Sequence, residues 1–250
     1  MRRFFIENRF IDGQSAQITG KDVNHLKNVL RLKVGEKVNV FDGTGIEYHA
    51  EIASIEPGVI LIDLNEPFTL NLDSPVKVTI GQGFLKDKKM DTLVRNLTEL
   101  GMVKWIPFMA SRSIPRPDKK RLAKRKERWQ GIARESLKQC LLSRLPEIND
   151  TVSYDDLLAL SDGCDLKIFF WEEETISLAE IPKKIKKTPE SIFIMLGPEG
   201  GFTESEANKA KEKGFITASL GPRIMKADTA SIAALTLVQY LFGDIGENIS

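Results

Sequence analysis

Short apolar runs alternate with amphipathic segments from about residue 74 onward. The runs of strand length are Val76–Ile80, Val103–Phe108, Leu166–Trp171, Ile192–Leu196 and Ile216–Leu220. Segments with apolar residues at helical spacing lie between or after them, at Asp87–Leu100, Lys119–Leu142 and Ala230–Phe242. Thr203-x-x-Glu206 has the pattern of a capping box that starts a further helix, which ends at Gly214. This alternation predicts an α/β domain with a mostly parallel sheet over residues 74–250.

The first seventy residues have a different pattern. Three short runs rich in β-branched or alternating apolar residues are separated by glycine-containing turns, and they are Lys37–Phe41, Tyr48–Ile52 and Val59–Leu64. This spacing predicts a small β-barrel domain over residues 1–70. One helix is expected within it at Val23–Leu32, with Asp22 as its N-cap. The segment Asn65–Pro75 is interpreted as a linker.

Composition narrows the class of protein. The chain has 250 residues, a net charge of +1, two cysteines and two histidines. Without a C-x-x-C pair, and with so few histidines, neither a metal nor a disulfide is expected to hold the fold. No run approaches the roughly 18 apolar residues of a membrane span, and the N-terminus lacks the apolar core of a signal peptide. A cytoplasmic protein without a membrane partner is expected.

Positive charge is concentrated in one stretch. Residues 112–128 hold nine Lys or Arg against Asp118 and Glu127, a local charge of +7. Such a stretch in a nearly neutral chain favours a site for a polyanion. A solvated helix face with flexible lysines is the alternative.

Two glycine-containing turns follow predicted strands near the C-terminus. Ile192–Leu196 runs into Gly197-Pro-Glu-Gly-Gly201, and Ile216–Leu220 runs into Gly221-Pro-Arg223. If the two strands are adjacent, the turns form a crevice walled by backbone groups at the carboxyl edge of the sheet. Glu199 would repel a phosphate, so a cationic or neutral ligand is expected. A loop shaped only by turn requirements is the alternative.

Other nucleotide and hydrolase signatures are absent from the sequence. Gly81-Gln-Gly83 follows a strand, but the third glycine of a dinucleotide fingerprint would fall at Lys86. There is no P-loop motif and no G-x-S-x-G motif. The acidic segment Glu172–Glu174 after an apolar strand is interpreted as a polar turn.

The two turns carry a family resemblance. Leu196-Gly-Pro-Glu-Gly-Gly-Phe-Thr-x-x-Glu206 and Leu220-Gly-Pro-Arg-Ile-Met-Lys-Ala-Asp-Thr-Ala230 resemble motifs of the RsmE-type ribosomal RNA uridine-N3 methyltransferases, within the SPOUT (α/β-knot) superfamily. Further matches are His25-Leu-x-x-Val-Leu-Arg31, Phe41-Asp-Gly-Thr-Gly45, Thr98-Glu-Leu-Gly101, Ser111-Arg-Ser113 and Glu135-x-x-x-Gln-Cys140. The match covers nearly the whole chain.

The resemblance implies an α/β fold whose C-terminal domain is tied in a trefoil knot, a PUA-like N-terminal domain and a homodimer. It also implies that S-adenosylmethionine binds in the two turns. The residues implied to bind it are Leu196, Gly197, Pro198, Glu199, Gly200, Gly201, Leu220, Gly221, Ile224, Met225 and Thr229. This chain departs from the family at Met225-Lys-Ala-Asp-Thr-Ala230, where Leu-Arg-x-Glu-Thr-Ala is usual, and at Leu142, where many members have arginine.

The implied reaction is methylation of N3 of a uridine in the 16S ribosomal RNA of the small subunit. Asp228 is the first candidate to handle the N3 proton or to orient the base, and Glu199 is the second. Asp228 as an N-cap of a helix starting at Thr229 or Ala230 is the structural alternative. Arg112 or Lys226 is expected to stabilise negative charge on the uracil.

Two basic patches are expected to contact ribosomal RNA through phosphates. Their residues are Arg2, Arg3, Arg9 and Arg31 in the small domain, and Arg112, Arg116, Lys119, Lys120 and Arg121 in the large one. Two other functions remain open: a ribose 2′-O-methyltransferase of the same superfamily, and a non-catalytic ribosomal RNA-binding assembly factor.

Overall fold

The computed structural model describes residues 2–70, 72–86, 88–114, 116–174 and 176–246. The chain divides into two compact units. Unit 1 contains Met1–Asp73 and Leu137–Leu145, and unit 2 contains Ser74–Ser136 and Pro146–Ser250. The predicted helix start at Asp87 lies outside the described residues.

Unit 1 is built on a six-stranded sheet in the order β1-β4-β5-β6-β3-β2. Its strands are β1 (Arg3–Phe5), β2 (Ile11–Asp12), β3 (Ser15–Thr19), β4 (Lys37–Phe41), β5 (Glu47–Glu56) and β6 (Val59–Phe68). All pairings are antiparallel except that of β1 with β4. The predicted linker therefore starts too early, because Tyr48 pairs with Pro67 and Glu47 with Phe68, which extends β6 to Phe68.

The helical segment of unit 1 differs from its prediction. It begins with α1 (Lys21–Asn24) and continues as a π-helical turn, His25–Val29. Asp22 is therefore in the first turn and is not the N-cap. Its carboxylate accepts hydrogen bonds from Lys138 Nζ at 2.8 and 3.0 Å. Of the apolar residues at helical spacing in this segment, Val23 and Leu26 are buried in the core of the sheet, whereas Val29 is 63% exposed.

A buried ion pair lies in unit 1 and corrects one prediction. Arg3 Nε donates to Glu47 Oε1 at 3.0 Å, and Arg3 Nη2 donates to the carbonyl of Leu142 at 2.7 Å. The two side chains are 5% and 0% exposed. Ser143 Oγ also donates to Glu47. Because its guanidinium is enclosed and paired, Arg3 has no free surface for a phosphate, and its prediction as an RNA contact is wrong.

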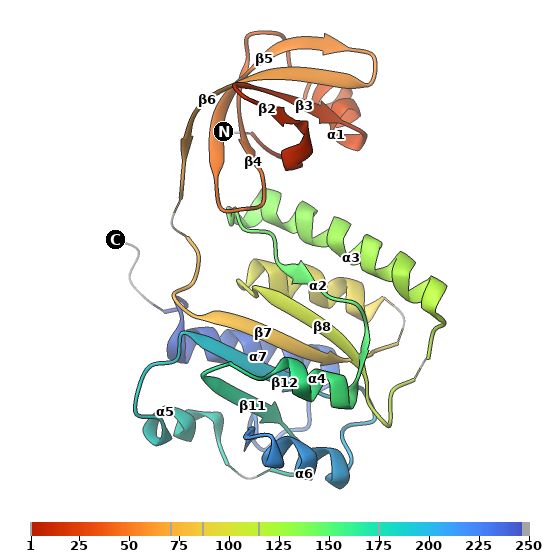
Figure 1. The fold of residues 1–250 in the computed structure, drawn as a ribbon, viewed down its shortest axis with the longest axis vertical. Coiled ribbons are helices and arrows are strands. Elements are labelled where there is room, and N and C mark those ends of the chain that lie inside the picture. The colour runs from red at the N-terminus through yellow and green to blue at the C-terminus, as the bar shows by residue number, and fades with distance from the viewer. Residues whose placement is uncertain (1, 71, 87, 115, 175, 247–250) are drawn as a thin grey trace. The chain divides into compact units, whose positions relative to one another are not determined.

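Unit 2 is built on a parallel sheet in the order β10-β8-β7-β12-β11-β13, with β9 also paired to β8 (Figure 1). Its strands are β7 (Lys77–Gly83), β8 (Lys104–Met109), β9 (Glu147–Ile148), β10 (Val152–Ser153), β11 (Leu166–Phe170), β12 (Ser191–Leu196) and β13 (Ile216–Ala218). All pairings within it are parallel. The predicted parallel α/β sheet is confirmed.

Helices cover both faces of this sheet (Figure 1). They are α2 (Lys89–Glu99), α3 (Lys119–Cys140, whose last turn belongs to unit 1), α4 (Tyr154–Leu160), α5 (Ile181–Lys184), α6 (Glu204–Glu212) and α7 (Ala227–Phe242). Successive residues of β8 point to opposite faces of the sheet, so they pack against different helices. Trp105 meets Trp129 of α3 at 4.9 Å between ring centroids, whereas Phe108 packs with Tyr154 of α4 and with Phe202.

The strand order corrects the predicted relation between the two glycine turns. β11 pairs with β12 on one side and with β13 on the other, so the strands before the two turns are not adjacent. The periodicity of the sequence cannot show this, because it predicts strands without their order. The loop that follows β11 consequently lies between the two turns.

Two helix ends also differ from the sequence prediction. α3 stops at Cys140, and Leu141 has a φ of 65°, which ends the helix two residues early. α7 begins at Ala227, so Asp228 is the second helical residue and is not an N-cap. The predicted capping box of α6 is confirmed, with Thr203 and Glu206 bonding each other's backbone.

Candidate functional site

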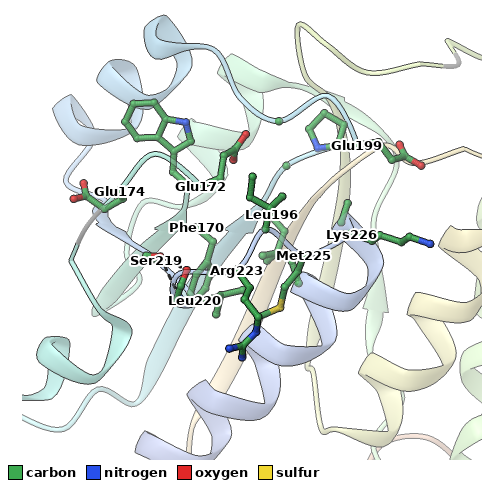
Figure 2. A pocket seen from close by; sticks show the side chains of 18 of the residues that line it. Phe170, Glu172, Glu174, Leu196, Glu199, Ser219, Leu220, Arg223, Met225 and Lys226 are labelled. Carbon is green, nitrogen blue, oxygen red and sulfur yellow. Dashed lines mark hydrogen bonds between the residues drawn. The ribbon is translucent and has the colours of Figure 1, made fainter.

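A cavity of about 800 Å³ lies where β11, β12 and β13 end, beside the first turns of α7 (Figure 2). Three loops wall it: Trp171–Glu174 after β11, Gly197–Gly201 after β12 and Ser219–Lys226 after β13. Carboxyl ends of parallel strands are the usual place for a ligand in such sheets. The other walls come from Lys89, Phe170, Ser177, Leu196, Ala227 and Ala230.

The loop after β12 is packed tightly against the end of β7. A Cβ on Gly83 would lie 2.5 Å from the nitrogen of Pro198 and 2.8 Å from the carbonyl carbon of Gly197. Gly201 has a φ of 67°, in the left-handed region that favours glycine. Its N–H donates to the carbonyl of Pro198 at 3.0 Å. The lack of a side chain at Gly83 thus lets the end of β7 approach the backbone of the loop after β12 more closely than any other residue would allow.

Arg112 holds the same loop from the other side. Its Nη1 donates to the carbonyls of Gly200 and Phe202, both at 3.2 Å. A Cβ on Gly200 would lie 2.9 Å from the Cβ of Arg112, so the missing side chain makes room for the arginine. The neighbouring amide of Ser111 donates to Glu206 Oε1 at 2.9 Å, which joins the Arg112 segment to the start of α6.

Glu199 points out of the loop toward α2. Its Oε1 accepts from the amide of Lys86 at 3.1 Å and from Lys89 Nζ at 3.0 Å. Burial raises the pKa of Glu199, but the hydrogen bonds from Lys89 and Lys86 outweigh that effect and leave the pKa below its ordinary value. The Glu199 carboxylate is thus ionised at neutral pH, and the ammonium of Lys89 balances its charge.

The loop after β13 is held by fewer contacts. Ser219 Oγ accepts from the amide of Gly221 at 3.1 Å and donates to its carbonyl at 3.2 Å. Beyond this turn, Pro222, Arg223 and Ile224 are exposed, and the Ile224 side chain is 91% exposed. An apolar residue this exposed on a cavity wall is suited to contact a ligand rather than the protein core.

The third wall carries no sequence motif. Trp171, Glu172 and Glu174 line the cavity, whereas the sequence predicts only a polar turn for the acidic segment. Glu174 accepts from Thr217 Oγ1 and, at 3.2 Å, from the amide of Ile176. One sequence signal does point to this segment. Like the two glycine turns, Glu172–Glu174 follows an apolar run of strand length, so it is expected at the same edge of the sheet.

A buried polar contact ties α7 to the sheet beneath the cavity. Ser231 Oγ donates to Gln82 Oε1 at 2.7 Å, and Gln82 Nε2 donates to the carbonyl of Gly83 at 3.1 Å. Both side chains are fully buried. Because unpaired buried amides cost free energy, this contact fixes the start of α7 relative to the end of β7.

Most residues predicted to bind the cofactor lie on the cavity wall. Those that do are Leu196, Gly197, Pro198, Glu199, Gly201, Leu220, Gly221, Ile224 and Met225. Gly200 and Thr229 belong to the same segments but do not line it. Of the residues predicted for the chemistry, Lys226 lines the cavity, whereas Arg112 and Asp228 do not. Asp228 is partly buried, and its Oδ1 has no hydrogen-bond partner among the described residues.

The basic residues predicted to contact RNA, apart from Arg3, lie at the surface. In unit 1, Arg2 pairs with Glu36 at 3.5 Å, Arg9 pairs with Glu7 at 2.8 Å, and Arg31 is exposed. In unit 2 the exposed residues are Arg112, Arg116, Lys119, Lys120 and Arg121. Further along α3, Lys126 and Arg128 are used in ion pairs with Asp150 and Asp91.

Two absences hold for the part of the chain that the structure describes. No group of three or more His, Cys, Asp or Glu side chains is arranged to hold a metal ion. No helix there has the length and apolar character needed to cross a membrane.

Two domain families match the chain. Residues 72–239 match the family described as RNA methyltransferase domain, and residues 18–64 match the RNA methyltransferase PUA domain. The first match contains all three loops that wall the cavity. The N-terminal match identifies unit 1 as containing a PUA-like domain.

Similar proteins agree with these matches. The ribosomal RNA small subunit methyltransferase E of Bacillus subtilis is 32% identical over 96% of both chains. The crystal structure of the Neisseria gonorrhoeae enzyme of the same name, bound to S-adenosyl methionine, superposes with a TM-score of 0.85 at 29% identity, over 98% of this chain and 99% of that one. A Legionella pneumophila methyltransferase in complex with SAM superposes with a TM-score of 0.88 at 26% identity, over 97% of this chain and 98% of that one. The chain therefore belongs to the ribosomal RNA small subunit methyltransferase E family.

Proposed function

We propose that this RNA methyltransferase transfers a methyl group from S-adenosylmethionine to N3 of a uridine in the 16S ribosomal RNA of the small subunit. The observation that carries the proposal is the 800 Å³ cavity at the ends of β11, β12 and β13. It coincides with the two motifs that carry the family resemblance.

The cavity residues fit S-adenosylmethionine. The volume is within the usual range of about 300–1,000 Å³ for small-molecule sites. Leu196, Ile224 and Met225 offer apolar surface for an adenine ring, and the two glycine loops offer backbone groups for a ribose. Carboxylates on the wall suit a cationic ligand better than a phosphate.

The chemistry requires alignment and the loss of one proton. When bound, S-adenosylmethionine supplies a methyl group on a sulfonium sulfur, which leaves as a neutral thioether. The new bond forms at N3 of the uracil, so the N3 proton must pass to a base or to water. N3 pairs with adenine in a duplex, so the target must be an unpaired or extruded uridine.

Three side chains are proposed to assist this step. Asp228 is retained as the candidate for handling the N3 proton, because its Oδ1 is buried without a partner beside the cavity-lining turn of α7. Lys226 lines the cavity and would stabilise negative charge on the uracil. Arg112 donates to loop carbonyls, so we propose that it positions the glycine loop in addition to any contact with RNA.

RNA docking is proposed for the exposed basic residues. Lys119, Lys120 and Arg121 occupy the first turn of α3, where positive charge opposes the helix dipole. Asp118 caps this turn by accepting from the amide of Arg121 at 2.8 Å. Three basic residues at a helix N-terminus are electrostatically unfavourable for the helix, so their presence supports a role in binding phosphate. In the small domain, Arg2, Arg9 and Arg31 are the corresponding candidates.

The finer features of the fold are proposed on the same resemblance. They are a trefoil knot in residues 74–250, a β-barrel form for the domain of residues 1–70, a homodimer and a location in the cytoplasm. The exposed side chains of Leu237 and Tyr240 on α7 are consistent with a subunit interface.

Two measurements test the proposed function. Calorimetry of the purified protein with S-adenosylmethionine should give one binding site per chain. Mass spectrometry of 16S ribosomal RNA from a strain lacking the gene should show the loss of one N3-methyluridine, restored by the wild-type gene. Loss of a ribose 2′-O-methyl group instead would favour the other superfamily reaction, and unchanged RNA would favour a non-catalytic assembly factor.

A further inference from the structure

Among the described residues, three carboxylates line the cavity, and two of them already have partners in the protein. Glu199 is neutralised by Lys89 at 3.0 Å. Glu174 accepts hydrogen bonds from Thr217 and from the amide of Ile176. Both carboxylates are therefore anchored by the fold, and neither is the natural partner for a cationic ligand.

Glu172 differs from both. Within the described residues, no Lys, Arg or His lies within ion-pair distance of its carboxylate, and no side-chain hydrogen bond is made to it. It lies directly against Gly201, where an added Cβ would overlap its Oε1. The glycine thus leaves space for this carboxylate at the edge of the cavity.

No ion pair among the described residues compensates this charge, and the ammonium of Lys211 lies over the neighbouring Trp171 ring, 5.5 Å from its centroid. Figure 2 shows the Glu172 side chain projecting from the loop after β11, while the side chains of Arg223 and Lys226 extend in other directions. Lys89 is paired with Glu199. The wall next to Gly201 therefore carries a local negative charge, although the chain as a whole is nearly neutral.

We propose that Glu172 makes the cavity selective for a cationic sulfonium donor over its neutral thioether product. The inference rests on the proposed function and concerns the same cavity. S-adenosylmethionine carries a positive sulfur, which methyl transfer converts into the uncharged sulfur of S-adenosylhomocysteine. An unpaired carboxylate on the wall attracts the charged sulfur of the first form and gains nothing from the uncharged sulfur of the second. Glu172 is thus a specificity-determining residue that favours donor binding and product release.

Calorimetry with three ligands tests the assignment. The ligands are S-adenosylmethionine, S-adenosylhomocysteine and sinefungin, which carries an ammonium group where the donor carries its sulfonium. In Glu172→Gln, we expect Kd to rise about 5- to 10-fold for the two cationic ligands and less than about 2-fold for the thioether, as for the loss of a partly screened charge pair. Glu173→Gln is the matched control, since Glu173 is an exposed neighbour that does not line the cavity.

Salt provides an independent measurement on the wild-type protein. The ratio of the thioether Kd to the donor Kd should fall as KCl rises from about 50 to 500 mM, because added salt screens the exposed carboxylate. The ratio in Glu172→Gln should be nearly independent of salt. This measurement holds even if the variant folds poorly.

Each outcome has a distinct meaning. An equal loss of affinity for all three ligands would show that Glu172 binds a shared group, such as a ribose hydroxyl or the α-ammonium, and would overturn the assignment to the sulfonium. An unchanged ratio in Glu172→Gln would also overturn it while leaving the proposed function intact. If the wild-type protein binds none of the ligands, the proposed function itself fails.

Discussion

The two glycine loops of the cavity resemble each other in sequence but are held in different ways. The loop after β12 is fixed by Gly83 packing on Pro198, by Arg112 on two carbonyls and by Lys89 on Glu199. The loop after β13 is fixed chiefly by the Ser219 turn, and it exposes Ile224. The first loop is thus shaped before a ligand arrives, whereas the second presents apolar surface that a ligand can cover.

The largest effect is expected where the two backbones touch. In Gly83→Ala, the new Cβ would meet backbone atoms of Pro198 and Gly197, which cannot move without displacing the loop after β12. We expect the free energy of unfolding to fall by about 2–3 kcal/mol, as in overpacked cores. Affinity for S-adenosylmethionine should fall about 50-fold or more, a loss of over 2 kcal/mol. Denaturant unfolding and calorimetry measure the two effects.

Gly131→Ala is the matched control for this substitution. Gly131 lies within α3, and nothing would lie within 4 Å of an added Cβ. Alanine favours a helix over glycine by about 1 kcal/mol, so this variant should be as stable as the wild type or more so. Equal destabilisation by both substitutions would contradict the close approach at Gly83.

Arg112→Ala removes the second support of the first loop. We expect a loss of about 1–2 kcal/mol in the free energy of unfolding, typical of lost charge-assisted hydrogen bonds. The Kd for S-adenosylmethionine should rise about 10-fold because the loop is less well positioned. Arg95→Ala, at an exposed position of α2, is the control. An unchanged Kd in Arg112→Ala would mean that the loop keeps its shape without the arginine.

Ile224→Ser tests the second loop. Because this side chain is 91% exposed, its removal should change the free energy of unfolding by less than about 0.5 kcal/mol. Affinity for S-adenosylmethionine should fall about 5-fold, because apolar surface covered by the ligand is lost. A large loss of stability, or full affinity, would refute the contrast between the loops.

The smallest expected effect is a change in how the free energy of unfolding depends on pH below neutrality. The pKa of Glu199 in the folded state lies below its ordinary value of 4.5. The stabilisation by this carboxylate is therefore fully present above about pH 4.5 and is lost as the pH falls through the lowered pKa. Glu199→Gln should lose less stability on acidification than the wild type, by under about 1 kcal/mol. Urea unfolding between pH 6 and pH 3 measures the difference, and parallel curves would contradict it.

Much of the fold follows from local sequence patterns. The strand-length runs of unit 2 and its capping box at Thr203 and Glu206 are confirmed, because burial and capping act over a few neighbouring residues. Predictions failed where distant residues decide the outcome. Asp22 is predicted to cap a helix, but it pairs with Lys138. The first residues of the predicted linker extend β6, because the start of β5 pairs with them.

The site was predicted only in part for the same reason. Its two glycine loops are visible as motifs, but the loop containing Glu172 carries no motif and joins them only through strand order. Arg3 illustrates the opposite error. It is one basic residue among several near the N-terminus, and only its burial against Glu47 separates it from the surface arginines.

The sequence by itself determined the longer strands and helices of the α/β part, the β-rich character of the N-terminal part, and the two glycine loops. It did not show β9, β10, α4 or α5, nor that Leu137–Leu145 belongs to unit 1. The features that it determined depend on hydrophobic periodicity and on turn residues, which act locally. Only the tertiary structure decided that β11 lies between β12 and β13, that Glu172 faces the glycine loop unpaired, and that Arg3 is buried. Those outcomes depend on which strands pair and which side chains lose water, and both bring together residues far apart in the chain.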